Sequence, residues 1–423
     1  MIELGYTICE KIFKEHSEQN EIEPDQYIEA FIDFIMVHEQ LGGRIHEEYE
    51  KLGLDYVWDP EKIFFILDHW VPAPTISAAQ MHQVCRKFAQ KYNFIHNMGM
   101  NEGICHQVLP EKGFARPGML IVGSDSHTTT YGAFNCLSTG IGASDTAVVF
   151  ATGKLWFKIP HSYKVNLIGN LSKGVMSKDF ILKFIGDIST KGALYKSLEF
   201  HGEGAKSLSI DARMTISNMV VEAGAKFGIF LYDDKSKRWL HNRTEKPYKI
   251  THPDTDAIYE KEYDYDLSEI IPYVAKPHSP GNLAEVEEVE GIKIDQAFLG
   301  SCTNGRIEDL QIAAEILKGK KVHPDIRLII IPASKEIYLE AISKGFIEIF
   351  IKAGAVVGNC TCGPCIGGHL GVLGPEEVCI SSTNRNFKGR MGDPSSKVYL
   401  ASPATVAASA INGKITDPRT VLE

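Results

Sequence analysis

The chain has 423 residues, of which 44% are hydrophobic and 23% charged, so it is long enough for about two to four domains and too apolar to be disordered. Its 44 Lys and Arg against 54 Asp and Glu give a net charge of −10, which disfavours binding to nucleic acid. The sequence starts without a secretion signal and its apolar runs are too short to cross a membrane, so we expect a cytoplasmic protein that binds no membrane.

Short apolar runs alternate with longer amphipathic segments, which predicts an α/β protein with largely parallel sheets. In the first part of the chain the predicted elements are strands over 62–67, 119–123 and 164–169 and a helix over 177–188. A further helix is expected over 215–224. Asn218 and Glu222, four residues apart, would share one face of it.

The segment 246–290 differs in composition from the rest of the chain, with five prolines among many acidic residues. This composition is typical of a solvent-exposed connection. We therefore expect two α/β lobes over 1–285, which include part of this connection, and a third α/β domain over 286–423.

In the last part of the chain the alternation of strands and helices resumes. The predicted elements are strands over 296–299, 327–331, 355–357, 378–381 and 398–401, and helices over 307–317, up to about 352, and at the C-terminus, where Gly413 is the expected cap. Polar clusters follow directly after these strands, at the sheet edge where open α/β folds place their sites.

The chain has nine cysteines, and without secretory features they are expected to be reduced thiols. Cys362 and Cys365 form a C-x-x-C motif, and Cys302 lies in a predicted turn after another strand. Three thiolates that converge in this way can hold a metal centre with one position left open. Two alternatives remain: a thioredoxin-like dithiol at Cys362 and Cys365, or a structural zinc site with Cys360 as a fourth ligand.

Histidines and carboxylates form a second set of candidate residues. They follow predicted strands or turns, or lie on a predicted helix, and comprise Asp68, His69, His106, Asp125, Ser126, His127 and Glu222. A carboxylate bonded to an imidazole fixes its tautomer and favours its protonated form, which makes the histidine a proton donor. A serine hydrolase is disfavoured because the chain has no G-x-S-x-G motif.

A third set follows the strand over 378–381, where Asn384, Arg385 and Arg390 lie in one loop. The planar guanidinium groups of two arginines match carboxylates, and phosphate would fit as well.

These motifs together resemble the aconitase superfamily in their order and spacing, with Ser-Asp-Ser-His-Thr at 124–128, Gly-Ser-Cys-Thr-Asn-Gly at 300–305, Cys-Gly-Pro-Cys at 362–365 and the loop 384–390. The length resembles the large subunits of the isopropylmalate dehydratase and homoaconitase group. The resemblance implies three domains of parallel-sheet α/β/α type. It also implies a separate small subunit that carries the swivelling fourth domain and the catalytic serine, which abstracts the carbon-bound proton.

The resemblance further implies that Cys302, Cys362 and Cys365 bind a 4Fe-4S cluster whose fourth iron has no protein ligand. His69, paired with Asp68, would protonate the leaving hydroxyl. The other implied roles are orientation of His106 by Asp125, support of His127 by Glu222, a pocket position for Ser126, and binding of substrate carboxylates by Arg385 and Arg390 with hydrogen bonds from Asn384 and Asn218.

The implied activity is that of a hydro-lyase that isomerises a hydroxy-di- or tricarboxylate by dehydration and rehydration. Conversion of 2-isopropylmalate to 3-isopropylmalate in leucine biosynthesis is the first expectation. Homocitrate is the second substrate considered, and a dimethylmalate- or citramalate-type substrate is the third. Two other classes are an RNA-binding protein without a cluster, which the net charge disfavours, and a zinc-stabilised scaffold.

Overall fold

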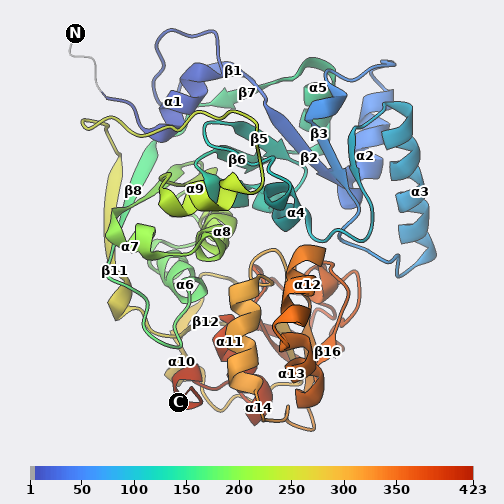
Figure 1. Ribbon diagram of the computed structural model, residues 1–423, viewed down its shortest axis with the longest axis vertical. Coiled ribbons are helices and arrows are strands. Elements are labelled where there is room, and N and C mark those ends of the chain that lie inside the picture. The colour runs from blue at the N-terminus through green and yellow to red at the C-terminus, as the bar shows by residue number, and fades with distance from the viewer. Residues whose placement is uncertain (1–4, 423) are drawn as a thin grey trace.

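The computed structural model describes residues 5–422 of the chain. The strands form four sheets, and helices cover their faces (Figure 1). In Figure 1 the N-terminal third lies at the top in blue and teal, the middle third at the left in green, and the C-terminal third at the bottom in orange and red.

The first large sheet is parallel and has five strands in the order β4-β3-β2-β5-β6. Its strands are β2 (Phe34–His38), β3 (Ile63–Ile66), β4 (His96–Met98), β5 (Leu120–Gly123) and β6 (Leu137–Gly140). The helices of this part are α1 (Ile8–Glu15), α2 (Glu39–Glu50), α3 (Ile76–Lys91), α4 (Cys105–Glu111) and α5 (Ala143–Thr152). A small antiparallel sheet consists of β1 (Tyr27–Phe31) and β7 (Lys154–Lys158).

The second large sheet is also parallel and has four strands in the order β10-β9-β8-β11. Its strands are β8 (Ser162–Ile168), β9 (Ser197–His201), β10 (Phe227–Phe230) and β11 (Lys261–Asp266). The helices of this part are α6 (Ser177–Ile188), α7 (Gly202–Ser207), α8 (Ile210–Met219) and α9 (Asp234–His241).

The third sheet has seven strands in the order β13-β12-β18-β17-β14-β15-β16 and is parallel except where β12 pairs with β13 and β18. Its strands are β12 (Tyr273–Ala275), β13 (Leu283–Glu285), β14 (Gln296–Leu299), β15 (Arg327–Ile330), β16 (Val356–Val357), β17 (Val378–Ser381) and β18 (Lys397–Leu400). The helices are α10 (Val286–Val289), α11 (Ile307–Leu317), α12 (Lys335–Ser343), α13 (Phe346–Ala353) and α14 (Pro403–Asn412).

Most predicted elements are confirmed to within two residues. The predicted strand over 296–299 and the helices over 177–188 and 307–317 coincide with β14, α6 and α11. Gly413 ends α14 with a φ of 69°, the left-handed conformation that glycine adopts without strain.

Three expectations differ from the structure. The single helix expected up to about 352 is divided into α12 and α13. The helix predicted over 215–224 begins earlier, because Ser209 caps α8, and it ends at Met219, where a 3₁₀ helix, η3 (Val220–Ala223), follows. The segment 246–290 is not only an exposed connection: it contributes β11 to the second sheet and β12 and β13 to the third. The side chains of β12 are buried, because β12 pairs with both β13 and β18.

The three large sheets are joined by shared apolar packing. The largest cluster of buried side chains includes Ile66 and Val108 from the first part of the chain and Leu310 and Ile330 from the third. Another cluster joins Phe180 and its neighbours on α6 to residues of the third sheet. This packing holds the carboxyl ends of strands from different sheets in fixed positions. No helix among the described residues is long and apolar enough to span a bilayer.

Candidate active site

The predicted site residues lie just beyond the carboxyl ends of parallel strands. Asp68 and His69 follow β3, and Asp125 follows β5 in the same sheet. Cys302 and Asn384 follow β14 and β17, which are neighbours in the third sheet. Asn218 near the end of α8 and Glu222 in η3 complete the set from the middle of the chain.

The three predicted cluster cysteines are buried, carry free thiols and share neighbours. The Cys302 Sγ lies 3.3 Å from the Asn218 amide nitrogen and 3.5 Å from that of Asn384. The amide oxygen of the same Asn384 is 3.9 Å from the Cys365 Sγ. Thr361, directly before Cys362, donates its hydroxyl to the backbone carbonyls of Asp68 and His69, at 2.9 and 3.1 Å. The three thiols therefore lie in one region of the molecule.

The surroundings of these thiols fit an iron–sulfur cluster. Side-chain amides already point at the Cys302 sulfur, and hydrogen bonds to sulfur are a feature of such sites. Burial raises the pKa of Cys302 to about 12, so metal binding must displace the thiol proton. The indole nitrogen of Trp70 is buried without a partner among the described residues, beside Gly368, where a Cβ would come within 2.6 Å of it.

The arrangement does not match a single zinc ion. Tetrahedral zinc–thiolate bonds of about 2.3 Å hold the sulfurs roughly 3.8 Å apart. In the described part of the chain these thiols do not form a group whose ligand atoms all lie within 4.8 Å of one another. Cys360 lies near Glu111 and Tyr338, and these charged or polar neighbours are not those of the other three thiols.

A thioredoxin-like dithiol is also disfavoured, because reactive thiols are partly exposed and have a low pKa. Cys362 and Cys365 are both buried, and burial raises the pKa of Cys362.

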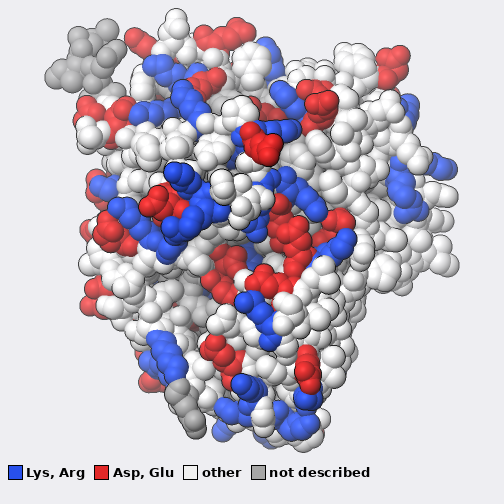
Figure 2. All heavy atoms as spheres, in the orientation of Figure 1, with Lys and Arg blue, Asp and Glu red and all other residues white. Residues whose placement is uncertain are grey.

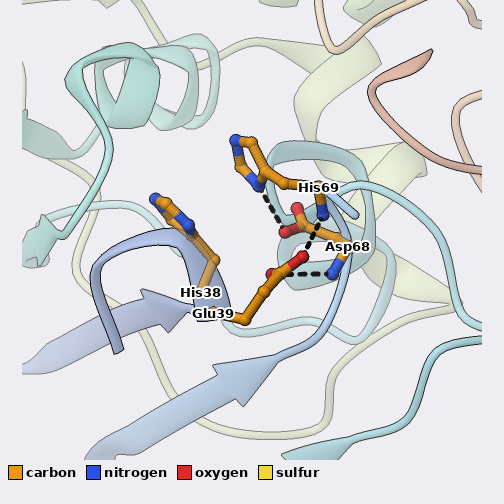
Figure 3. A group of neighbouring side chains, drawn as sticks. All are labelled: His38, Glu39, Asp68 and His69. Atoms are coloured by element: carbon orange, nitrogen blue, oxygen red, sulfur yellow. Dashed lines mark hydrogen bonds and ion pairs between the residues drawn. The ribbon is translucent and has the colours of Figure 1, made fainter. Parts of the chain in front are cut away.

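His69 is held by the carboxylate of Asp68 (Figure 3). Its Nδ1 lies 2.6 Å from an oxygen of Asp68, whose other oxygen accepts the backbone N–H of Cys105 at 2.7 Å. Burial opposes a charged imidazole, but Asp68 outweighs it and raises the pKa of His69 well above its usual range. His69 is therefore protonated near neutral pH and can act as a proton donor.

Glu39, which we did not predict as a site residue, fixes the turn that carries His69. One of its oxygens accepts the backbone N–H groups of His69 and Trp70, both at 2.7 Å, and the other accepts that of Asp68 at 3.0 Å (Figure 3). Glu39 directly follows β2, the strand paired with β3. Its position after a buried strand was the sequence signal that could have identified it.

His38, Glu39, Asp68 and His69 lie close enough together to be considered as metal ligands. Their ligand atoms are already engaged, however. The Nδ1 of His38 accepts the backbone N–H of Gln40 at 3.2 Å, and the carboxylates accept the bonds described above. The Nε2 of His38 thus carries its proton and faces the Ser124 carbonyl at 3.2 Å. This group is a hydrogen-bonded support for His69, whose ring stacks on that of His38.

Asp125 organises the other two predicted histidines. One of its oxygens lies 2.8 Å from the Nε2 of His106 and accepts the backbone N–H of His127 at 2.7 Å. Burial acts to raise the pKa of Asp125, but the hydrogen bonds with His106 and His127 outweigh it and hold the pKa well below its usual value. The Nδ1 of His106 faces the hydroxyl of Tyr131 at 3.1 Å. The predicted orientation of His106 by Asp125 is thus present in the structure.

Glu222 connects the histidines to the arginine loop. A single oxygen of Glu222 lies 2.9 Å from the Nε2 of His127 and accepts the Arg385 Nε at 2.7 Å. The terminal nitrogens of the Arg385 guanidinium take no part in this contact and have no hydrogen bond with the described residues. The Nε of Arg390, in the same loop, is buried without a partner among the described residues.

Ser126 takes no part in these contacts. It lines a groove of about 600 Å³ together with Leu41 and Val221.

A second cavity, of about 570 Å³, lies between α4, α9, α11 and α12 and is lined by several charged residues, among them Glu111, Asp211 and Arg238. Figure 2 shows acidic side chains gathered around a hollow near the centre of one face. No predicted site residue lines the second cavity.

The chain is similar to known proteins over nearly its whole length. The aconitase family (aconitate hydratase) model matches residues 10–291 and 282–413. The 3-isopropylmalate dehydratase large subunit of Caldanaerobacter subterraneus is 50% identical over 419 residues, covering 99% of this chain and 100% of that protein. The 3-isopropylmalate dehydratase large subunit 1 of Methanopyrus kandleri is 49% identical over 419 residues, with the same coverage.

A protein named "Probable methanogen homoaconitase large subunit" from Methanothermobacter thermautotrophicus is 48% identical over 423 residues, covering 99% of this chain and 98% of that protein. The crystal structure of Thermococcus kodakaraensis aconitase X in its holo-form has the same fold, with a TM-score of 0.52 at 12% identity, and covers 91% of this chain and 93% of that one. The family match and the full-length relatives together show that this chain belongs to the aconitase family.

Proposed function

We propose that this chain is the large, catalytic subunit of a 3-isopropylmalate dehydratase, a hydro-lyase that interconverts 2-isopropylmalate and 3-isopropylmalate in the cytoplasm. Aconitase-family membership implies an iron–sulfur cluster in general terms. The observation that carries the proposal is the contact of Thr361 with the backbone carbonyls of Asp68 and His69, because it places a proton donor beside the segment that carries Cys362.

In this proposal Cys302, Cys362 and Cys365 hold a 4Fe-4S cluster. When bound, the cluster supplies a Lewis acid at the iron without a protein ligand, which makes hydroxide a better leaving group. His69 donates the proton that leaves with the hydroxyl, because Asp68 keeps the imidazole charged. The Glu39 clamp holds the His69 backbone in place during this transfer.

The substrate carboxylates are proposed to bind Arg385 and Arg390. Arg385 is preoriented by its Nε bond to Glu222, so its two terminal nitrogens can meet a carboxylate as a planar fork. Asn384 and Asn218 lie between this loop and Cys302 and orient the loop toward the thiols. His106 and His127 are fixed by Asp125 and Glu222, and we assign them to the support of the site around the substrate.

A second subunit is part of the proposal. The relatives are named large subunits, which implies a small-subunit partner. The residues converging on the thiols supply proton donors and carboxylate ligands, and we assign the base that removes the carbon-bound proton to a serine of that partner, on its swivelling domain.

Anaerobic reconstitution with iron and sulfide, followed by assay with 2-isopropylmalate, tests the proposal. Turnover is expected only after a matching small subunit is added. Cys362→Ser is expected to abolish both iron binding and turnover. Cys360→Ser serves as the control and is expected to retain both, because the proposal assigns Cys360 no iron and its thiol has Glu111 as a neighbour. Full turnover without a partner, or loss of iron in the Cys360 variant but not in the Cys362 variant, would contradict the proposal.

Homoaconitase activity is the second candidate, because one relative named as a homoaconitase large subunit is as similar as the dehydratases, at 48% identity. The two substrates differ in the group beyond the shared hydroxy-acid core. A direct comparison of kcat/KM for 2-isopropylmalate and homocitrate separates the two functions, and a higher value for homocitrate would replace the first proposal with the second.

A further inference from the structure

Lys178 on α6 is a buried lysine without an ion-pair partner. Its side chain is 0% exposed. No carboxylate of the described residues lies within ion-pair distance of its Nζ. Other lysines of this chain form ion pairs with carboxylates, and most of these pairs are at the surface. An isolated buried charge is costly, so the surroundings must compensate for it.

Two carboxylates that act on Lys178 accept hydrogen bonds from other groups. Asp179 accepts the backbone N–H groups of Met176 and Tyr273, at 2.8 and 3.0 Å. Asp309 accepts the side-chain amide of Asn304 and the backbone N–H of Arg306, at 3.0 and 2.9 Å. Lys178 thus has no carboxylate among the described residues as a direct hydrogen-bond partner.

The Lys178 Nζ instead contacts the loop that carries Asn384. Its Nζ donates to the backbone carbonyls of Ser382 and Thr383, at 3.0 and 2.5 Å. The next residue is Asn384, whose side chain contacts both Cys302 and Cys365. Burial lowers the pKa of Lys178, and after Asp309 the groups that act most strongly in the opposite direction are Cys365 and Cys302.

We propose that Lys178 positions Asn384 against the cysteine set, because it fixes the two backbone carbonyls that directly precede Asn384. This inference rests on the proposed function, because it takes the three cysteines as the ligands of the cluster. Lys178 comes from the middle part of the chain, whereas the cysteines and Asn384 come from the third sheet. Retention of the cluster would thus depend on Lys178 and therefore on α6, a helix outside the segment that carries the cysteines.

The test compares wild-type large subunit with Lys178→Met, Lys178→Gln and Lys178→Arg after anaerobic loading with iron and sulfide. Lys183→Met is the control, because Lys183 lies on the same helix and pairs with Asp187 at the surface. Iron retained over time in the presence of a chelator, the EPR spectrum of the reduced protein, and the thermal midpoint of the unloaded protein are measured.

The neutral variants are expected to release iron about tenfold faster or more, a typical effect of losing a group that supports metal ligands. Lys178→Arg is expected to retain iron better than either neutral variant, and Lys183→Met is expected to match wild type. The unloaded Lys178→Met protein is expected to be at least as stable as wild type, because it no longer buries an unpaired charge. If Lys178 only supported the fold, the unloaded Lys178→Met protein would be less stable than wild type.

Each other outcome has a definite meaning. A folded neutral variant that retains iron as wild type does would overturn the inference and leave the proposed function intact. Failure of both neutral variants to fold without iron would also overturn it, because Lys178 would then serve the fold. Failure of the wild-type protein to take up iron and sulfide would overturn the proposed function, and the inference with it.

Discussion

At the level of single residues, the site works by sharing carboxylates among imidazoles. Asp125 contacts His106 and His127, and its second oxygen lies 3.9 Å from the Nε2 atoms of both His38 and His69. One anion therefore influences four imidazoles. A carboxylate that stays ionised while buried in this way can orient several rings without itself exchanging protons.

Asp125→Asn should uncouple these rings. The amide is neutral and offers one acceptor oxygen, so His106 and the turn at His127 lose the anion that orients them. We expect kcat of the assembled enzyme to fall by about 10²–10⁴-fold, the usual range for a lost acid–base arrangement. Steady-state kinetics measures this effect. Asp55→Asn, at an exposed position, is the control, and equal activities of the two variants would contradict the role of Asp125.

Arg385→Lys should weaken substrate binding although it preserves the charge. Lysine cannot bond Glu222 through one nitrogen and present a planar fork to a carboxylate through two others. Loss of one charge-assisted hydrogen bond costs about 1.5–3 kcal/mol, so kcat/KM should fall roughly 10- to 150-fold. Lys388→Met in the same loop is exposed and should leave kcat/KM unchanged. A wild-type value for Arg385→Lys would exclude Arg385 from carboxylate binding.

The sequence predicted the residues of this site better than their supports. The cysteines, Asp68, His69 and Asp125 carry recognisable chemistry at the ends of strands, and the resemblance implied their roles. Glu39 was not predicted as a site residue, because three backbone N–H groups from another strand's loop define its role. Such contacts depend on strand order, which a single sequence does not reveal.

At the level of elements, buried strands and strongly amphipathic helices were predictable, whereas sheet membership was not. β14 and α11 match their predicted ranges. The hairpin of β12 and β13 lies within the proline-rich acidic segment, whose composition resembles a linker. Its strands have only three residues each, and pairing with β18 stabilises them. Short strands that depend on partners far away in the sequence leave no periodicity to detect.

Glu111 links two elements and should impose a pH dependence on stability. It ends α4 and accepts the hydroxyl of Ser334, the N-cap of α12, at 2.7 Å. Burial raises the pKa of Glu111 from 4.5 to about 7, so between these values the folded protein binds a proton that the unfolded chain releases. The stability that this proton confers is present at low pH and is lost as the pH rises toward 7.

Glu111→Gln should remove this dependence, because the amide keeps an acceptor for Ser334 and has no proton to lose. Relative to wild type, the variant should gain up to about 3 kcal/mol between pH 4.5 and 8, since each pKa unit corresponds to 1.36 kcal/mol. Denaturation midpoints of the unloaded protein at both pH values measure this gain. Glu336→Gln, at a neighbouring exposed carboxylate, should behave as wild type. Parallel pH profiles for wild type and Glu111→Gln would show that Glu111 stays charged in the fold.

At the level of the whole molecule, the site lies where the three large sheets meet. The cysteines belong to the third sheet, His69 and Asp125 to the first, and Asn218, Glu222 and Lys178 to the middle of the chain. The apolar clusters cross the same boundaries. A group bound by the cysteines therefore touches residues of every part, and its binding should stabilise the contacts between them as well as one loop.

Loading with iron and sulfide should accordingly raise the thermal midpoint of the entire chain. A ligand that binds only the folded state at 100 times its Kd adds about 2.7 kcal/mol, which corresponds to a rise of a few degrees for a protein of this size. Calorimetry of loaded and unloaded protein measures the shift, and removal of iron by a chelator should reverse it. Limited proteolysis provides a second measurement, because cleavage in segments distant from the cysteines, such as 246–260, should also slow down. If loading protected only the loop around 360–371, the three parts would be independent in stability, and the site would be a property of the third sheet alone.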